Sequence, residues 1–289
     1  MERRVFIGAL AAATTLPRKW SSYFPLPASH ARIAKVGIQL YTVRDMMKAD
    51  FEGTLAKVAQ VGYREVEFAG YFDHTPVQVR AVLDKNGLAA PSCHVGYDNT
   101  AEDKWPATLE TVKAVGHQYV VCAWIPEEAR GKTADDWKRV GDRFNKAGQA
   151  AQAAGVQFAY HNHNFEFVPL PDKQIPYDVL LANTDPKLVQ LEVDLFWITF
   201  AGADPVGYFM KNMGRFPMVH VKDMIKKPSP DVTPDKVMVD VGKGSIDWKA
   251  IFAHSGHAGI QHYFVEHDQP PQPLVDIKTS FDYLNGLEF

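Results

Sequence analysis

The sequence predicts an α/β protein that folds as a (β/α)8 barrel, or TIM barrel, in one domain over residues 34–289, after an N-terminal export signal. After residue 33, eight short apolar runs alternate with segments of helical periodicity. The apolar segments are continuous runs rather than alternating patterns, which is typical of parallel strands buried on both faces. Eight strand–helix units of this kind close most simply into a barrel.

The expected elements follow one another without a linker that would divide the domain. The strands are expected at residues 36–41, 65–68, 89–94, 119–123, 156–161, 188–194, 218–222 and 263–266. The helices are expected at residues 51–61, 76–86, 101–115, 134–154, 177–183, 205–213, 248–253 and 273–284. A glycine follows each of the first four helices, as expected where a helix ends: Gly62, Gly87, Gly116 and Gly155.

Residues 1–31 are expected to form a twin-arginine export signal and its linker. Arg3 and Arg4 stand next to each other, Phe6 follows closely, and residues 9–16 form a short apolar run. That run is too short to cross a bilayer comfortably. The sequence therefore predicts a periplasmic or otherwise exported protein. The alternative is a terminal helix in which two arginines occur by chance.

The composition excludes several classes of protein. Apolar residues make up 46% of the chain and charged residues 22%, so most of its length can fold around a large core. The net charge of −3 and the lack of a Lys/Arg-rich run argue against a nucleic-acid surface. No apolar stretch predicts a membrane span. The two cysteines, Cys93 and Cys122, are expected to be buried strand thiols, with a disulfide as the alternative.

Ligand-type side chains stand at the ends of four consecutive strands. Active sites of such barrels lie at the carboxyl ends of the strands, and alternate residues of a strand point the same way. The sequence predicts one divalent metal ion held by a residue from each strand: His161, Asp194, His220 and Glu266. Two imidazoles and two carboxylates favour Mn, Co, Fe, Ni or Zn over Mg. The alternative for each histidine is an ordinary hydrogen-bonded position.

Six motifs together resemble the sugar phosphate isomerase/epimerase superfamily, which has a xylose-isomerase-like barrel and includes tagatose 3-epimerase and inosose dehydratase. The resemblance covers roughly residues 34–289. The motifs are GIQLYTVRD at 37–45, YHNHNFEF at 160–167, LEVDLFW at 191–197, HVKDM at 220–224, VGKGSIDW at 241–248 and FVEHDQP at 264–270.

The resemblance implies one divalent metal bound by a Glu, an Asp, a His and a second Glu on the last four strands. The Asp matches Asp194, the His matches His220 and the last Glu matches Glu266. The first position departs, because this chain has His161-Asn162-His163 where relatives have Glu-Asn-His. Two opposed metal-bound glutamates are therefore not reproduced. The departure weakens a plain 3-epimerase and favours a single base acting beside a polarised carbonyl.

The expected roles follow from these positions. Glu266 is the first choice of base, and His163 and Lys222 are expected to act as acids or substrate clamps. Lys222 and Asp223 have the alternative of a surface ion pair. Glu166 is expected to hold a sugar hydroxyl. The mouth of the barrel is expected to be lined by His94 and by aromatic rings that pack against a sugar face, which are Tyr41, Trp124 and Trp197, with Tyr71 and Phe165 as further candidates.

The predicted function is a metal-dependent sugar isomerase or epimerase that removes an α-proton from a keto-sugar or sugar derivative and forms an enediolate. A lyase with the same metal site is the main alternative, either a dehydratase or an enzyme of 3-keto-glycoside elimination or hydrolysis. An endonuclease-like phosphodiesterase and a non-catalytic sugar-binding barrel are further alternatives. The expected partner is a small carbohydrate, and a homo-oligomer is left open.

Overall fold

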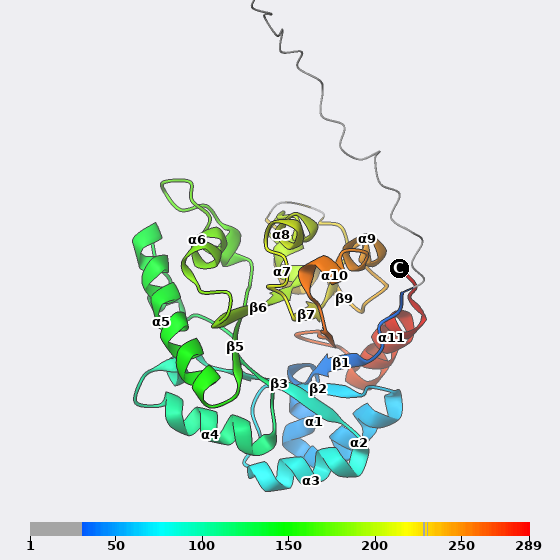
Figure 1. The fold of residues 1–289 in the computed structure, drawn as a ribbon. Helices are drawn as coiled ribbons and strands as arrows, with labels where there is room; N and C mark the ends of the chain where they lie inside the picture. The colour runs from blue at the N-terminus through cyan, green and yellow to red at the C-terminus, as the bar shows by residue number, and fades with distance from the viewer. Residues whose placement is uncertain (1–30, 228, 230) are drawn as a thin grey trace, which may run out of the picture. The chain divides into compact units, whose positions relative to one another are not determined.

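Eight parallel strands form a closed barrel in the computed structural model, which describes residues 31–289 except 228 and 230 (Figure 1). Around the barrel the strands follow the order β1-β10-β7-β6-β5-β4-β3-β2. Their bounds are β1 (Val36–Gln39), β2 (Glu65–Phe68), β3 (Ala89–Val95), β4 (Tyr119–Cys122), β5 (Gln157–His161), β6 (Val189–Asp194), β7 (Met218–Val221) and β10 (His262–Val265). The predicted (β/α)8 barrel is therefore confirmed. An antiparallel pair, β8 (Asp223–Met224) and β9 (Met238–Val239), lies outside it.

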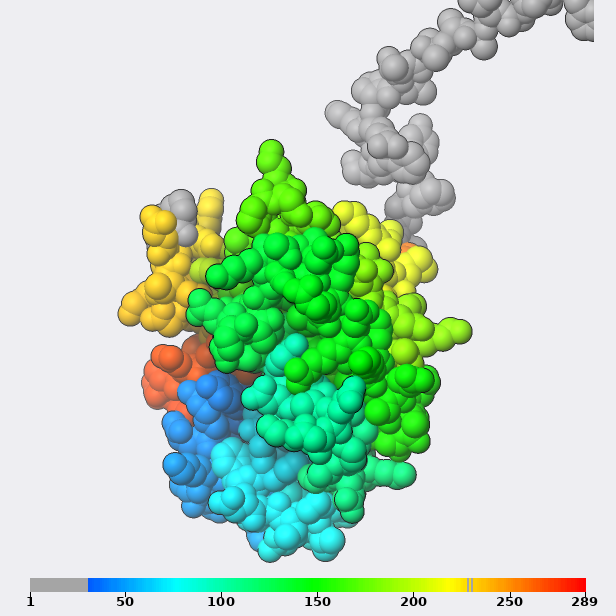
Figure 2. Space-filling view, turned by 90° about the vertical axis from the view of Figure 1, so that its left-hand side faces the viewer, coloured from blue at the N-terminus to red at the C-terminus, as the bar shows by residue number. Residues whose placement is uncertain are grey.

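Helices cover the outside of the barrel. Their bounds are α1 (Arg44–Ala49), α2 (Phe51–Val61), α3 (Pro76–Asn86), α4 (Trp105–Val115), α5 (Ala134–Ala153), α6 (Pro176–Asn183), α7 (Leu195–Phe200), α8 (Pro205–Lys211), α9 (Trp248–Phe252), α10 (Ser255–Ala258) and α11 (Pro273–Gly286). Figure 2 shows α3, α4 and α5 side by side on one face, coloured from cyan to green. None of the helices in the described ranges is long and apolar enough to cross a membrane.

Local sequence explains where the helices begin and end. Thr75 and Thr133 cap α3 and α5 through capping boxes, in which the cap side chain and the residue three positions later bond to each other's backbone. Gly87 and Gly116 end α3 and α4 with positive φ. The main difference from expectation is at α4. That helix starts at Trp105, because a short 3-10 turn occupies residues 97–100 and ends before it.

An apolar layer divides the barrel interior into two polar ends. Val121, Ala159, Met218 and Phe264 are fully buried and pack together. Phe264 needs the space beside Gly37, because a Cβ at Gly37 would lie 2.6 Å from the Phe264 Cδ1. The layer therefore separates the carboxyl-end side chains from those at the opposite end of the strands.

The two cysteines are buried on neighbouring strands and are not joined. Cys93 pairs in register with Val120, and Cys122 pairs with Val95. Both thiols are free, and burial raises the pKa of each to about 12, so neither is poised to react. The expected export signal and its linker, residues 1–31, lie outside the described part of the chain except for residue 31.

Candidate metal centre and pocket

A cavity of about 640 Å³ opens at the carboxyl end of the barrel. Residues at or just after the ends of all eight strands contribute to its walls, as active sites of this fold require. Eight of the predicted site residues line it, namely Tyr41, His94, Trp124, His161, His163, Trp197, Lys222 and Glu266. Asp194 and His220 are fully buried just beneath.

The four predicted metal ligands lie next to one another on strands β5, β6, β7 and at the end of β10. The Asp194 Oδ2 lies 3.8 Å from the His161 Nε2 and 3.8 Å from the His220 Nδ1. The Glu266 Oε2 lies 2.8 Å from the His220 Nδ1. The separations among Asp194, His220 and Glu266 suit donor atoms that share one ion, since each donor stands about 2 Å from a bound transition metal, and His161 lies beside Asp194. We call these four residues the upper group.

Lys222 adds a buried cation to the upper group. Its ammonium lies 3.1 Å from the Asp194 Oδ2, 2.7 Å from the Glu266 Oε2 and 2.8 Å from the Asp268 Oδ1. Only 2% of the Lys222 side chain is exposed, so the alternative of a surface ion pair with Asp223 is wrong. Three carboxylates around it hold the pKa of Lys222 well above its usual value, although burial alone would lower it.

Asp223 has a structural role instead. Its carboxylate accepts hydrogen bonds from the backbone N–H of Gly242 at 2.9 Å and of Gly244 at 3.2 Å, and from the Trp248 Nε1 at 3.1 Å. A Cβ at Gly244 would lie 2.1 Å from the Asp223 Oδ1, so the close approach of this loop needs glycine. The VGKGS segment is thereby fixed as a turn before α9, which Asp247 caps.

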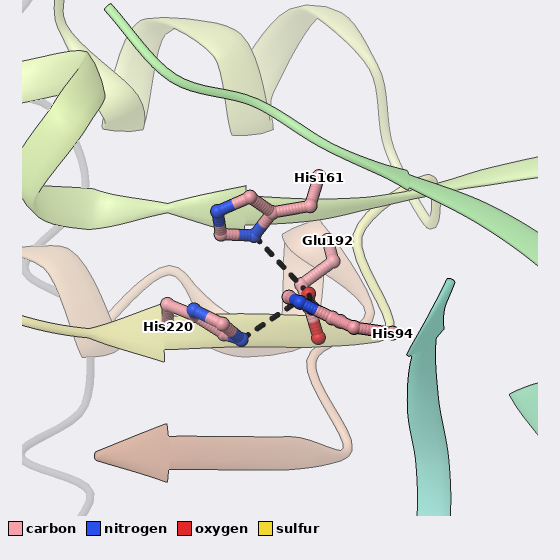
Figure 3. A group of neighbouring side chains, drawn as sticks. All are labelled: His94, His161, Glu192 and His220. Carbon is pink, nitrogen blue, oxygen red and sulfur yellow. Dashed lines mark hydrogen bonds and ion pairs between the residues drawn. The ribbon is translucent and has the colours of Figure 1, made fainter. Parts of the chain in front are cut away.

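A second set of side chains lies directly beneath the upper group. The Glu192 Oε2 lies 2.7 Å from the His94 Nε2, 3.1 Å from the His161 Nδ1 and 3.2 Å from the His220 Nε2, and Figure 3 shows these rings converging on it. The Glu67 Oε2 lies 2.7 Å from the His220 Nε2, and the Gln39 side-chain amide donates to it at 2.7 Å. We call Glu67, His94 and Glu192 the lower group.

The lower group orients the imidazoles of the upper group. His161 and His220 each face an upper carboxylate with one nitrogen and a lower carboxylate with the other. A histidine ligand commonly gives its second ring N–H to a carboxylate, which fixes its tautomer and raises its basicity. Sequence reasoning missed Glu67 and the role of Glu192. Both stand two residues from another acidic residue on the same strand, so strand alternation was the available signal.

The charges of the site are strongly coupled. Burial alone would lower the pKa of His94, but Glu67 and Glu192 outweigh it and raise that pKa to about 9. Burial alone would lower the pKa of His220 too, but Glu192 and Glu266 hold it well above its usual value. Burial raises the pKa of Asp194 to about 6 against the opposing charge of Lys222. Burial and nearby cations keep the pKa values of His161 and His163 low, so both rings are neutral.

The residues present fit a divalent metal ion. Among the described residues, the Asp194 Oδ2, Glu192 Oε1 and Glu67 Oε1 are buried without a hydrogen-bond partner, although the Lys222 ammonium is close to Asp194. Buried carboxylate oxygens without partners are rare unless an ion or a ligand completes them. Ligand atoms also converge within 4.8 Å in two sets, Asp194–His220–Glu266 and His94–His161–Glu192–His220. Imidazole and carboxylate donors together suit transition metals.

Three predicted substrate contacts, Glu166, Tyr71 and Phe165, do not line the cavity. The Glu166 carboxylate is fully buried and accepts hydrogen bonds from the Tyr160 hydroxyl and, at 2.9 Å, from the His163 backbone N–H. Its position therefore does not support a sugar contact, and it fixes the loop that carries His163 instead. The Tyr71 hydroxyl bonds the His117 Nε2 at 2.9 Å, and its ring packs on Phe68 beneath the helices.

Comparisons with known proteins identify the family to which this chain belongs. The family described as "Xylose isomerase-like TIM barrel" matches residues 55–285. The chain is 24% identical over 263 residues to an inosose dehydratase of Geobacillus thermodenitrificans, covering 81% of this chain and 86% of the relative. It is 28% identical to a sugar phosphate isomerase/epimerase structure from Parabacteroides distasonis, with a TM-score of 0.76, covering 88% of this chain and 99% of that one. It shares its fold with an IolI structure that contains a zinc atom, at 17% identity and a TM-score of 0.68, covering 86% and 95% of the two chains.

Proposed function

Because this chain belongs to the xylose isomerase-like TIM barrel family, we propose that it is a divalent-metal-dependent sugar isomerase or epimerase. Its reaction would begin with removal of a proton next to the carbonyl of a keto-sugar or sugar derivative. The observation that carries this proposal is the convergence of Asp194, His220 and Glu266 at the floor of the cavity, with His161 3.8 Å from Asp194. Buried groups with shifted pKa values in a cleft are typical of an acid–base site.

The upper group would hold the ion, and its donor set favours Mn, Co, Fe, Ni or Zn over Mg. When bound, the ion would polarise the substrate carbonyl and stabilise the negative charge that develops on the enediolate. The lower group would keep the His161 and His220 rings in the orientation that presents one nitrogen upward. Fixing those rings in advance lowers the cost of assembling the site.

Glu266 is the proposed base. Within the described residues its hydrogen bonds and ion pairs run through Oε2, and the side chain lines the cavity. Lys222 and His220 hold the pKa of Glu266 well below its usual value despite burial, so the base is ionised at neutral pH. Lys222 would donate a hydrogen bond to a substrate oxygen, and the neutral His163 ring would accept or return a proton.

Elimination is the second candidate reaction. After the same proton is removed, loss of a group from the β-carbon would give dehydration, or release of the leaving group from a 3-keto-glycoside. Two observations favour it. The curated relatives reported above include an inosose dehydratase. His161 also stands where a second metal-bound glutamate is expected from the resemblance, so the site offers one carboxylate base rather than two.

Incubation with a panel of keto-sugars and 3-keto-glycosides in heavy water tests the proposal. Deuterium in recovered substrate or product would report proton abstraction, and product mass would separate isomerisation from elimination. A chelator should abolish the exchange, and one equivalent of Mn²⁺ or Co²⁺ should restore it. Exchange that persists without metal would contradict the metal-dependent proposal. A requirement for two or three ions would favour a phosphodiesterase, and metal binding without turnover of any sugar would favour a binding protein.

We propose further that the enzyme is exported by the twin-arginine sequence in residues 1–31, so that it meets its substrate outside the cytoplasm. Expression of the full chain with Arg3→Lys and Arg4→Lys should retain the protein in the cytoplasm. Unchanged export of the variant would contradict the proposed export signal.

A further inference from the structure

A row of aromatic rings leads from the mouth of the cavity to its floor. The Trp124 ring lies 4.4 Å from the His163 ring, which lies 5.4 Å from the Trp197 ring, centroid to centroid. The Lys222 ammonium lies 5.3 Å from the Trp197 ring. All four residues line the cavity. The wall is thus three rings long before it reaches the proposed centre, whereas a monosaccharide presents only one ring to cover.

The wall changes from exposed to buried along its length. Trp124 is 44% exposed at the mouth, and Trp197 is 9% exposed near the floor. The outer ring is held firmly all the same. The Arg130 guanidinium lies 4.2 Å above the Trp124 ring and 3.6 Å above the Phe165 ring, and the Arg130 Nε donates to the Ile125 carbonyl at 2.9 Å. An exposed indole fixed in this way is a preformed platform for a flat apolar face.

Polar groups without partners occur along the same wall. The Trp197 Nε1 and the His163 Nδ1 are buried and have no hydrogen-bond partner among the described residues. An indole N–H can only donate, so it requires an acceptor such as a hydroxyl or ring oxygen. A buried polar atom without a partner is costly unless a ligand or water completes it. Both atoms belong to residues that line the cavity, so this wall holds polar groups that the described residues leave without a partner.

The charges around the cavity disfavour a phosphate group. Lys222 is already shared among Asp194, Glu266 and Asp268. Arg44, a second cation in the lining, stacks 4.1 Å from the Tyr41 ring and donates at 2.8 Å to the carbonyls of Tyr41 and Asp268. Two acidic side chains, Glu266 and Asp268, face the same space. A dianionic phosphate that does not reach the proposed metal ion would meet these carboxylates, while Lys222 and Arg44 already have partners.

From these observations we propose that the site takes a neutral substrate of two rings, in which a sugar on the floor is joined to a second ring that stacks on Trp124. The proposal rests on the proposed function for the placement of the first sugar at Glu266 and Lys222. The second ring must present a flat apolar face and carry no charge. Either another sugar or an aromatic group meets this requirement. A neutral two-ring substrate of this kind differs from the sugar phosphate on which a sugar phosphate isomerase would act.

Binding measurements on the intact metal-loaded protein test the proposal without turnover. The probes are methyl β-glucoside with one ring, cellobiose with two sugar rings, phenyl β-glucoside with an aromatic second ring, and glucose 6-phosphate. Ligand-observed NMR titrations should give dissociation constants for at least one two-ring probe about five- to tenfold lower than for methyl glucoside, the range expected of one added stacked ring. Glucose 6-phosphate should bind more weakly than methyl glucoside.

Variants locate the second ring. Trp124→Ala should remove the advantage of the two-ring probes while changing methyl glucoside binding less than about twofold, and Trp124→Phe should restore part of it. Val168→Ala is the matched control, because Val168 is 58% exposed on a nearby loop and does not line the cavity. The control should leave the ratios unchanged. Thermal melting should show that each variant is folded.

Three results would overturn the proposal: equal binding of one-ring and two-ring probes, no detectable binding of either two-ring probe, or tighter binding of glucose 6-phosphate. Loss of selectivity in the Val168→Ala control would overturn it as well. Failure of the proposed function is distinguishable. If Trp124→Ala changes binding but no sugar exchanges deuterium, the proposed reaction is contradicted and the proposed binding site for a second ring at Trp124 is supported. If sugars exchange deuterium but Trp124→Ala does not change binding, the proposed reaction is supported and the binding site at Trp124 is contradicted.

Discussion

The two ends of the barrel interior carry the same kinds of side chain and hold them differently. At the amino end, the His262 Nδ1 pairs with the Glu65 Oε2 at 2.8 Å, one imidazole against one carboxylate. At the carboxyl end, His220 alone contacts Glu67, Glu192 and Glu266. The apolar layer around Phe264 separates the two ends.

The difference teaches which end is structural. A single matched pair satisfies its own charge, as at Glu65 and His262. The carboxyl end instead gathers several carboxylates, and among residues 31–289 as described it leaves oxygens of Glu67, Glu192 and Asp194 without hydrogen-bond partners. Such oxygens are costly in a buried place unless an ion or substrate completes them. The amino end is therefore expected to support stability, and the carboxyl end to support chemistry.

The largest effect is expected from Glu266→Gln. Replacing the proposed base by a neutral isostere should lower the rate of deuterium incorporation by about 10²–10⁴-fold, the usual contribution of a general base. The variant should still bind metal, with equal or moderately lower affinity, and its melting temperature should stay close to that of the parent protein. Unchanged turnover would remove Glu266 from the role of base.

Glu67→Gln should have the next largest effect, on metal affinity. The Glu67 carboxylate contacts the His220 Nε2 at 2.7 Å, and its loss should weaken metal binding by about 10–100-fold, as for other carboxylates that orient a histidine ligand. Competition with a fluorescent chelator measures this. Glu67 is a positioning residue, so the variant should recover activity at high metal concentration. Affinity equal to the parent protein's would show that His220 needs no such partner.

Metal affinity should rise with pH. The pKa of Asp194 is raised to about 6, so a proton competes with the ion below that pH. The pKa of His220 is held well above its usual value, so binding must displace its proton across the neutral range. Affinity should therefore increase between pH 6 and pH 8, by up to about tenfold per pH unit for each proton released. Titration in two buffers of different ionisation enthalpy would detect the protons, and a flat profile would contradict their displacement.

The smallest effect is expected from Glu65→Gln, the matched change at the amino end of the same strand. It should cost about 1–2 kcal/mol of stability, because the buried hydrogen bond between the Glu65 carboxylate and His262 loses its charged partner. Metal affinity and turnover should stay as in the parent. A loss of metal comparable with that of Glu67→Gln would erase the contrast between the two ends.

Much of this architecture could be predicted from the sequence. The strand positions followed from continuous apolar runs and the helix ends from glycines such as Gly87 and Gly116. The upper group followed from alternation at the strand ends. Which residues stand level across the barrel was not predictable, because the stagger between strands decides that. His161 pairs in register with Glu192, and Asp194 pairs with His220.

The loops show a second feature that could not be predicted from the sequence, namely the hydrogen-bond partners of their polar side chains. Glu166 has the residue type of a sugar contact, but the Tyr160 hydroxyl and a backbone N–H hold its carboxylate within the protein. Lys222 and Asp223 look like an exposed pair in the sequence, yet they point to different places, one to the proposed centre and one to the loop before α9. Tertiary hydrogen bonds decided both, and no local pattern reports them.

A crystal structure of the protein loaded with Mn²⁺ or Co²⁺, with anomalous diffraction at the metal edge, tests the central claim most directly. We expect one strong anomalous peak among the His161 Nε2, Asp194 Oδ2, His220 Nδ1 and Glu266 Oε2, with Lys222 turned toward Asp268. A peak between His94 and Glu192 instead, or none in the barrel at one ion per chain, would contradict the account.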